Sequence, residues 1–252
     1  MRNIMKIYVT ENYEAMSHKA AEVIAAQVIT KPGSVLGLAT GSTPIGIYGL
    51  LSKWHADGYV SFSDADSVNL DEYLGLRGNH PQSYRYFMQI NLFDHIDIRT
   101  DHTHLPDGQA PDPESECLRY EELITSLGGI DLQLLGLGHN GHIGFNEPGD
   151  AFEPGTHVVD LAESTIRANS RLFSSIDEVP RRAITMGIGG IMGAKRILMA
   201  VNGAEKADIV YRAFTGPVTP QVPASILQLH PDVILVGDRA ALSKLTKGGT
   251  VI

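Results

Sequence analysis

A short glycine-rich segment of this 252-residue chain carries most of the side chains that could move a proton. The segment, Gly136–Pro148, follows an apolar run. It holds five polar residues, namely His139, Asn140, His142, Asn146 and Glu147. Histidine titrates close to neutral pH, and a nearby glutamate can orient an imidazole and tune its basicity. The pattern favours an acid–base site, although the same glycines and polar groups could instead form and cap a tight turn.

The glycines of this segment also match a dinucleotide-binding pattern. Gly136, Gly138 and Gly141 give a formal GxGxxG after a predicted strand, and Asp160 lies about where a ribose-binding acid would stand. Such a pattern normally opens directly into a helix and starts the first strand–helix–strand unit of its fold. Here a turn follows at residues 146–149, and the segment begins only after residue 130. An NAD-dependent oxidoreductase is therefore the weaker interpretation.

Metal chemistry is also a weaker interpretation. His139 and His142 are three residues apart and His102 and His104 are two apart, but neither pair forms an HExxH motif. Cys117 is the only cysteine, and nothing near it in the sequence favours a reactive thiolate. No disulfide can form within the chain, which fits a reducing cytoplasm. We predict that the protein needs neither a metal nor another cofactor.

A second candidate site follows the first predicted strand, Ser34–Thr40. Gly41, Ser42, Thr43 and Pro44 come next and lead into a helical pattern. Glycine lets the backbone approach a ligand, Ser42 or Thr43 suits the helix N-cap, and Pro44 suits the first helical turn. The exposed N–H groups and the positive helix end would attract an anion. The alternative is an ordinary capped turn; a Walker loop is excluded because GxxxxGK[ST] is absent.

Charged residues near other strand ends could complete such a site. Lys206 lies in the turn after a predicted strand that ends at Val201, and Arg171 lies in the string Ala-Asn-Ser-Arg. Either could bind a phosphate, although isolated basic residues are usually solvated surface charges. Asp71 and Glu72 also follow an apolar strand. The two carboxylates could act as a general base and its helper, or they could begin a turn or helix.

The pattern of apolar residues predicts the elements that must position these side chains. The predicted strands are Ser34–Thr40, Asp66–Asp71, Ile130–Gly138, His157–Leu161, Ala183–Ile188, Arg196–Val201 and Val233–Gly237. The predicted helices are Tyr13–Ile29, Ile45–Ala56, Gln82–Phe93, Pro113–Leu127, Ala204–Phe214 and Arg239–Leu245. This alternation is typical of an α/β fold with a doubly wound, mostly parallel sheet and helices on both faces. Ligands of such sheets bind at the carboxyl ends of the strands, where all the candidate residues lie.

The composition limits the class of protein. Hydrophobic residues make up 43% of the chain and charged residues 19%, an ordinary balance for a globular domain. We expect one domain over residues 1–252, without a secretory signal or a membrane span. The net charge is −9 and no basic stripe is present, so nucleic acid and anionic membranes are improbable partners. A small anionic substrate would need strong local donors.

Taken together, these motifs resemble the glucosamine-6-phosphate deaminase family. The resemblance runs from about residue 5 to about residue 240 and rests on blocks in the family's order. The blocks are LATGSTP at 38–44, NLDEY at 69–73, the segment 136–148, ANSR at 168–171, TMGIG at 185–189 and the turn at 203–207. The string GHIGFNEP at 141–148 is the most specific of them.

The resemblance implies a role for each candidate residue. His142 would move the proton during opening of the sugar ring, supported by Asn140 and Glu147. Asp71 would carry a proton from carbon 2 to carbon 1 of the open aminoaldose. The phosphate group would be held by Gly41, Ser42, Thr43, Arg171 and Lys206. The products would be fructose 6-phosphate and ammonia, without a metal or nucleotide.

Some features depart from the family's pattern, and other functions remain open. Some members have aspartate where this chain has Asn140, and regulated members have basic residues where it has His157 and Val159. An unregulated enzyme, either a monomer or a homo-oligomer, is the expectation. A galactosamine-6-phosphate deaminase/isomerase would share nearly every motif, and a 6-phosphogluconolactonase would share the fold and the phosphate loop. A sugar-phosphate sensor would normally carry a DNA-binding segment, for which we find no room.

Overall fold

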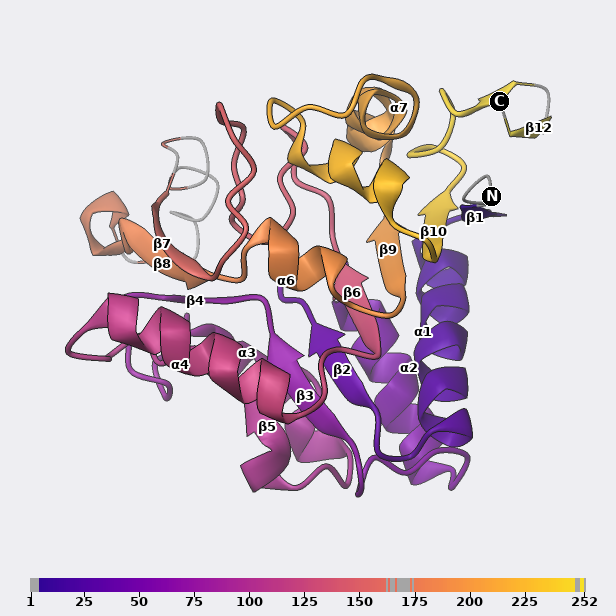
Figure 1. Cartoon of the computed structure of the whole chain (residues 1–252). Coiled ribbons are helices and arrows are strands. Elements are labelled where there is room, and N and C mark those ends of the chain that lie inside the picture. The colour runs from indigo at the N-terminus through magenta and orange to yellow at the C-terminus, as the bar shows by residue number, and fades with distance from the viewer. Residues whose placement is uncertain are drawn as a thin grey trace.

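The fold is built around a seven-stranded parallel sheet (Figure 1). The computed structural model describes residues 5–161, 163, 166, 173, 175–247, 250 and 251. Across the sheet the strands are β1 (Lys6–Thr10), β10 (Val233–Asp238), β9 (Ile197–Val201), β6 (Leu132–Leu135), β2 (Val35–Leu38), β3 (Asp66–Asn69) and β5 (Thr103–His104). Because the strands are parallel, their carboxyl ends lie along the same side of the sheet, here called the strand-end edge. This brings together the segments that follow β2, β3, β6 and β9.

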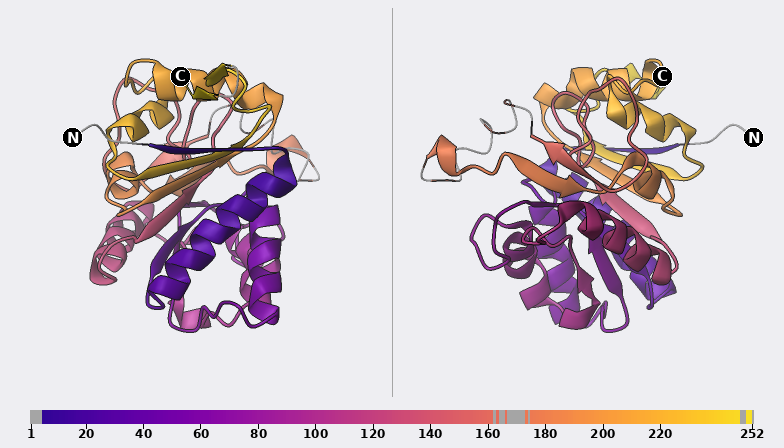
Figure 2. Two further views of the ribbon diagram at one scale, coloured as in Figure 1. Left: turned by 90° about the vertical axis from the view of Figure 1, so that its right-hand side faces the viewer. Right: turned by 60° about the vertical axis from the view of Figure 1, so that its left-hand side comes forward.

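Helices cover both faces of this sheet (Figure 2). They are α1 (Tyr13–Thr30), α2 (Ile45–Ala56), α3 (Tyr84–Asn91), α4 (Pro113–Ser126), α6 (Ile188–Met192) and α7 (Ala207–Thr215). The chain moves outward from β2 through β3 to β5 and then returns to β6, β9 and β10. With right-handed crossovers, this reversal puts α1 to α3 on one face and α4, α6 and α7 on the other.

A smaller antiparallel sheet adjoins the edge where the candidate residues lie. It consists of β4 (Asp71–Tyr73), β8 (Arg182–Thr185) and β7 (His157–Asp160), in the order β4-β8-β7. Only Leu70 separates β4 from β3, and it bonds to both sheets. Its N–H donates to Leu38 O at 3.3 Å, and its carbonyl accepts from Met186 N at 2.7 Å. Asp71 thus begins a new strand at the point where β3 ends.

The local sequence explains the longest helix. The Asn12 side chain accepts a hydrogen bond from Ala15 N at 2.9 Å and caps the start of α1. Apolar residues spaced by three or four positions then form one buried stripe, which includes Met16, Ala20, Ile24 and Val28. The central strands β2 and β6 are buried along their whole length, as strands covered on both faces must be.

The predicted fold class is confirmed, and four details of the prediction are wrong. Residues 239–245, predicted as a helix, form a series of turns. The predicted strand Asp66–Asp71 is interrupted at Leu70, and the strands around 157–161 and 183–188 belong to the small sheet. The edge strand β1 was not predicted, because its mixed and partly exposed residues show no clear alternation. None of the helices in the described part of the chain is long and apolar enough to cross a membrane.

Candidate active site

The strongest chemical feature of the strand-end edge is the buried carboxyl group of Asp71. Its side chain is nearly inaccessible, with 6% of the residue's surface exposed. Burial, and secondarily the negative charge of Glu72, raise the pKa of Asp71 to about 8. Within the described residues no donor forms a hydrogen bond with this carboxyl group. A carboxyl group in such surroundings favours its neutral form. When it is ionised, it is a far stronger base than an ordinary aspartate.

Glu72 does not face the same side of the strand. Successive side chains of β4 alternate, and the Glu72 carboxylate points to the start of α3, where it accepts from Tyr84 N at 2.9 Å and Arg85 N at 3.0 Å. It also accepts from Tyr73 N at 2.9 Å. The interpretation of Glu72 as a helper for proton transfer is therefore wrong. Its carboxylate caps the first turn of α3 and acts on Asp71 only through its charge.

The glycine-rich segment closes into a network of three side chains. Nδ1 of His142 lies 3.2 Å from Oε1 of Glu147, and the other oxygen of Glu147 accepts from the Asn140 amide. The Asn140 oxygen in turn accepts from His142 N at 3.1 Å. The His142–Glu147 pair has ion-pair distance but not the alignment of a hydrogen bond. The structure thus brings together the three residues that the sequence singled out in this segment.

Two glycines of this segment are required by close packing. A Cβ atom at Gly138 would lie 2.3 Å from the ring of His142, so any side chain there would displace the imidazole. Gly144 has a φ of +57°, and a Cβ there would lie 3.0 Å from Oγ1 of Thr185 and 3.6 Å from Oδ2 of Asp71. The segment that carries the imidazole network therefore also passes close to the Asp71 carboxyl group. These contacts explain Gly138 and Gly144 without a nucleotide.

Two tyrosine hydroxyls hold the backbone of the loop after β2 on its protein-facing side. The Tyr13 hydroxyl of α1 lies 3.1 Å from the carbonyls of Ser42 and Thr43 and accepts from Gly46 N at 2.8 Å. The Tyr48 hydroxyl binds both backbone groups of Ala39. These long-range contacts were not visible in the sequence. They fix the backbone of the loop with its carbonyls turned toward the protein.

The upper side of this loop remains open. Gly41 has a φ of +103° and nothing within 4 Å of the position of a Cβ atom. In the described part of the chain, the N–H groups of Gly41, Ser42 and Thr43 form no hydrogen bond. Pro44 is the N-cap of α2 and not its first helical residue, and no side chain caps this helix. The predicted capping by Ser42 or Thr43 is therefore wrong, which leaves the helix N-terminus available to an anion.

Lys206 lies beside this loop, across the end of β6. Its Nζ donates to Leu137 O at 2.7 Å. Burial lowers the pKa of Lys206, and the charge of Glu205 partly opposes this effect. The turn that carries Lys206 is held by the buried Asp238, whose carboxylate accepts from Gly203 N at 3.1 and 3.2 Å. Arg171, the other predicted phosphate ligand, lies outside the described residues.

An aromatic wall that the sequence did not reveal flanks Asp71. Tyr84 packs against Tyr73 and Phe145, with ring centroids 4.8 and 6.0 Å apart. Its hydroxyl donates to the Tyr73 hydroxyl at 3.2 Å and also interacts with Thr40. Burial raises the pKa of Tyr84 well above its usual value, so its hydroxyl stays protonated. This wall shields the carboxyl group from water.

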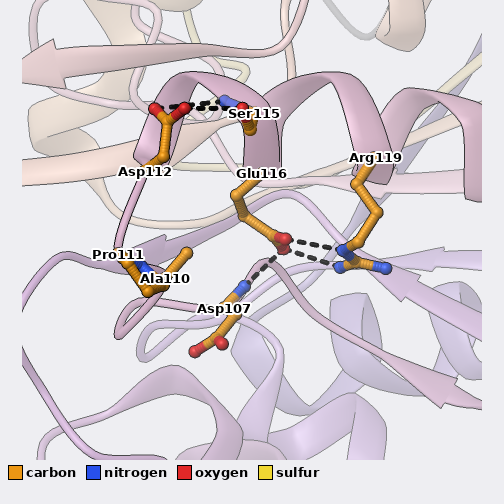
Figure 3. A pocket seen from close by; sticks show the side chains of 7 residues that line it. All are labelled: Asp107, Ala110, Pro111, Asp112, Ser115, Glu116 and Arg119. Atoms are coloured by element: carbon orange, nitrogen blue, oxygen red, sulfur yellow. Dashed lines mark hydrogen bonds and ion pairs between the residues drawn. The ribbon is translucent and has the colours of Figure 1, made fainter.

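A prominent surface hollow lies elsewhere and lacks suitable chemistry. It measures about 630 Å³ and is lined by the start of α4 and the loop before it (Figure 3). Its charged groups are already engaged, because Glu116 binds Arg119 and Asp107 N, and Asp112 binds Ser115. A second hollow of about 390 Å³ lies behind the active-site segment and is lined in part by Asn146 and Glu147. Among the described residues, no three histidine, cysteine or acidic side chains are placed to hold a metal ion.

Comparison with known proteins decides the family. Residues 10–235 match the family described as glucosamine-6-phosphate isomerases/6-phosphogluconolactonase. The chain belongs to the glucosamine-6-phosphate isomerase/6-phosphogluconolactonase family. A family member from Lachnoclostridium phytofermentans, named glucosamine-6-phosphate deaminase, is 61% identical over 232 residues, which are 92% of this chain and 98% of that protein. A protein of the same name from Clostridioides difficile is 55% identical and covers 96% of this chain and 97% of its own length.

Solved structures of the family agree with the fold. A monomeric glucosamine-6-phosphate deaminase superposes with a TM-score of 0.92 at 48% identity, covering 95% of this chain and all of that one. A 6-phosphogluconolactonase from Trypanosoma cruzi superposes with a TM-score of 0.78 at 19% identity, covering 98% of this chain and 99% of that one. The lactonase shows a shared fold alone.

Proposed function

We propose that this protein converts glucosamine 6-phosphate and water to fructose 6-phosphate and ammonia. The observation that carries the proposal is the buried Asp71 carboxyl group, which lies under the segment that holds His142 and beside an open anion-binding loop. An isomerisation that moves hydrogen between two carbons needs such a base. The relatives that share more than half of their residues with this chain carry the name of this activity.

The first step is opening of the sugar ring. His142 moves a proton between the anomeric hydroxyl and the ring oxygen, and the ring then opens to the aldehyde. Glu147 lies 3.2 Å from Nδ1 of the imidazole and stabilises the imidazolium that forms in transit. Asn140 holds Glu147 in place through its amide. As an amide it adds no second negative charge, so a single carboxylate balances His142.

The second step is proton transfer by Asp71. The ionised carboxylate takes the proton from carbon 2, and the aldehyde oxygen takes a proton from the substrate's ammonium group, which leaves an enolamine. The carboxyl group then returns its proton to carbon 1 to give the protonated imine of fructose 6-phosphate. Water then adds to the imine carbon, and ammonia leaves with the electron pair of the carbon–nitrogen bond. A protonated amino group of the incoming substrate favours the ionised form of Asp71. The aromatic wall excludes bulk water and keeps the transferred proton on the carboxyl group.

Binding of the phosphate group fixes the position of the substrate for both steps. In the proposal, the N–H groups of Gly41, Ser42 and Thr43, which form no hydrogen bond among the described residues, bind the phosphate at the start of α2 together with the ammonium of Lys206. Arg171 completes this group of ligands in the proposal. Binding energy at the phosphate can be used to position carbon 2 against the base.

The experiment is to incubate EDTA-treated protein with glucosamine 6-phosphate and to measure ammonia and fructose 6-phosphate together. Equal amounts of both products without added metal or nucleotide support the proposal. Product only from galactosamine 6-phosphate would change the sugar epimer and leave the chemistry intact. Hydrolysis of 6-phosphogluconolactone without release of ammonia would overturn the proposal.

We further propose that the enzyme is a single-domain monomer of the cytoplasm. Residues 1–252 act as one domain, since the site draws on segments from Tyr13 to Asp238. The monomeric state of the 48%-identical solved deaminase supports a monomer. The single cysteine supports a reducing compartment, the cytoplasm. Sedimentation at two protein concentrations tests the monomer.

A further inference from the structure

Asn202 is a polar residue of the strand-end edge that neither the motifs nor the proposed mechanism uses. It directly follows β9 and is half-buried. The Thr43 hydroxyl donates a hydrogen bond to its Oδ1 at 3.1 Å. This contact spans the end of β6, because β9 and β2 lie on either side of that strand. Asn202 therefore joins the turn that carries Lys206 to the anion-binding loop.

The backbone on both sides of this contact is fixed. Asp238 holds Gly203 N, and Lys206 N donates to Gly203 O at 3.1 Å, which closes a tight turn after Asn202. On the other side, Tyr13 holds the carbonyl of Thr43. The Asn202 amide thus connects two rigid segments, and its position is set by the fold.

The hydrogen bond with Thr43 also orients the amide. When Oδ1 accepts from the hydroxyl, the remaining polar group of Asn202 is Nδ2, which can only donate. Within the described part of the chain, Nδ2 forms no hydrogen bond. The loop and the turn that Asn202 joins also carry the N–H groups of residues 41–43 and the ammonium of Lys206, all of which are donors. The ligand that such a set of donors shares is an anion.

We propose that Asn202 contacts the phosphate of the substrate through Nδ2, and that the Thr43 hydroxyl keeps the amide in the donating orientation. This inference rests on the proposed function for the identity of the substrate and names one more residue that selects for its phosphate. Asn202 acts in binding, and the proton transfers of the reaction do not involve it.

Two substitutions of Asn202 separate this role from a structural one. Asn202→Asp keeps an acceptor for Thr43 but turns a carboxylate oxygen toward the phosphate, whereas Asn202→Ala removes both groups. We expect KM to rise about tenfold in the alanine variant and about a hundredfold in the aspartate variant, with kcat within about twofold of wild type. If Asn202 only anchors Thr43, the aspartate variant will resemble wild type and the alanine variant will be the weaker enzyme, and the proposal fails.

A binding measurement keeps the test independent of turnover. Calorimetric titration with inorganic phosphate and with fructose 6-phosphate is expected to show the same order, namely wild type, alanine variant, aspartate variant. Asn91→Asp adds the same charge at the last residue of α3, outside the loop and the turn that Asn202 joins, and is expected to bind like wild type. Thermal unfolding of each variant confirms that it is folded.

The two proposals fail in different ways. A wild-type enzyme that releases no ammonia from any hexosamine phosphate overturns the proposed function. Unchanged phosphate affinity in a folded Asn202→Asp variant overturns the role of Asn202, whatever the reaction.

Discussion

Two buried aspartates at opposite ends of the strands of the main sheet have opposite electrostatic surroundings. Asp131 lies at the amino end of β6 and is 4% exposed, and Asp71 lies beyond the carboxyl end of β3 and is 6% exposed. Burial alone would raise the pKa of Asp131, but hydrogen bonds from Lys195, Lys31 and Val35 N outweigh it and lower the pKa. Asp71 has no such donors among the described residues, and its pKa rises to about 8. One carboxylate stabilises the fold, whereas the other costs stability when ionised, a cost that its proposed role as a base would explain.

The largest expected effect is on turnover. Asp71→Asn removes the base and nearly preserves the shape of the side chain, so we expect kcat to fall by roughly a thousandfold or more, with KM little changed. Steady-state release of ammonia measures this effect. An equal loss of affinity for fructose 6-phosphate would instead make Asp71 mainly a binding residue. The raised pKa of Asp71, unlike the lowered pKa of Asp131, would then have no link to proton transfer.

The next effect concerns ring opening. His142→Gln removes the titrating group, and we expect slower turnover by roughly ten- to a hundredfold, with the loss confined to the step before proton transfer at carbon 2. Loss of tritium from carbon 2 of a substrate analogue that cannot cyclise isolates the later step. His139→Gln is the matched control, because His139 lies in the same segment but outside the network with Glu147. Equal slowing with the open analogue would contradict the role of His142.

Replacing each of the two aspartates by asparagine is expected to change the free energy of unfolding in opposite directions. The pKa of Asp71 is higher in the folded chain than in the unfolded chain, so its contribution to stability is present at low pH and lost as the pH rises through about 8. Asp71→Asn is therefore expected to stabilise the protein at pH 8, on the order of 1–3 kcal/mol.

The pKa of Asp131 is lower in the folded chain than in the unfolded chain. Its contribution is therefore present at neutral pH and lost as the pH falls through the folded-state value. Asp131→Asn is expected to destabilise the protein at pH 7 by about 1–3 kcal/mol, a range that allows for the exposure of both lysines. Chemical denaturation at pH 5 and pH 8 measures both variants, and destabilisation of the same sign in both would break the comparison.

A smaller effect is expected on the pH profile. Glu72 contributes to the raised pKa of Asp71, after burial, so Glu72→Gln is expected to move the acidic limb of kcat/KM to lower pH by about half a unit to one unit. The matched control is Glu116→Gln, which alters another buried, hydrogen-bonded glutamate whose charge is not among the causes of the raised pKa of Asp71. An unchanged limb would mean that burial alone sets the pKa.

The smallest effect is expected at Glu205. A Cβ atom at Gly203 would lie 2.4 Å from the Glu205 carboxylate, so this negative charge lies over the turn that carries Lys206, the proposed phosphate ligand. Glu205→Gln is expected to lower KM for the sugar phosphate by about two- to threefold at low salt, and less at high salt. Glu114→Gln, an exposed change on α4, controls for net charge. A rise in KM would show that Glu205 supports Lys206 more than it repels the substrate.

The sequence predicted features that depend on local patterns. The glycine-rich segment was recognised from its own residues, and the helix Ile45–Ala56 was predicted with its observed bounds, since its apolar spacing is regular. The order of strands and helices was sufficient for the fold class. It also placed Asp71, His142 and Lys206 at the same edge of the sheet.

The parts that were not predicted depend on contacts between distant segments. Glu72 and Asp71 look equivalent in the sequence, and only the alternation of a strand that begins at Asp71 sends them to opposite sides. Tyr13 lies 29 residues from the loop that it holds, and Asp238 lies 35 residues from Gly203. No local pattern encodes such a pairing. The break at Leu70 was missed for the same reason, because Leu38 and Met186 define it.

Leu70, which bonds to both sheets, also links the two parts of the proposed site. In the proposal, the large sheet carries the loop that binds the phosphate, and the small sheet carries Asp71. A single residue connects them, with its N–H on Leu38 and its carbonyl on Met186. A shift of one sheet against the other would therefore move the base relative to the bound phosphate. The two backbone bonds of this leucine thus act as a spacer between the binding part and the reacting part of the proposed site.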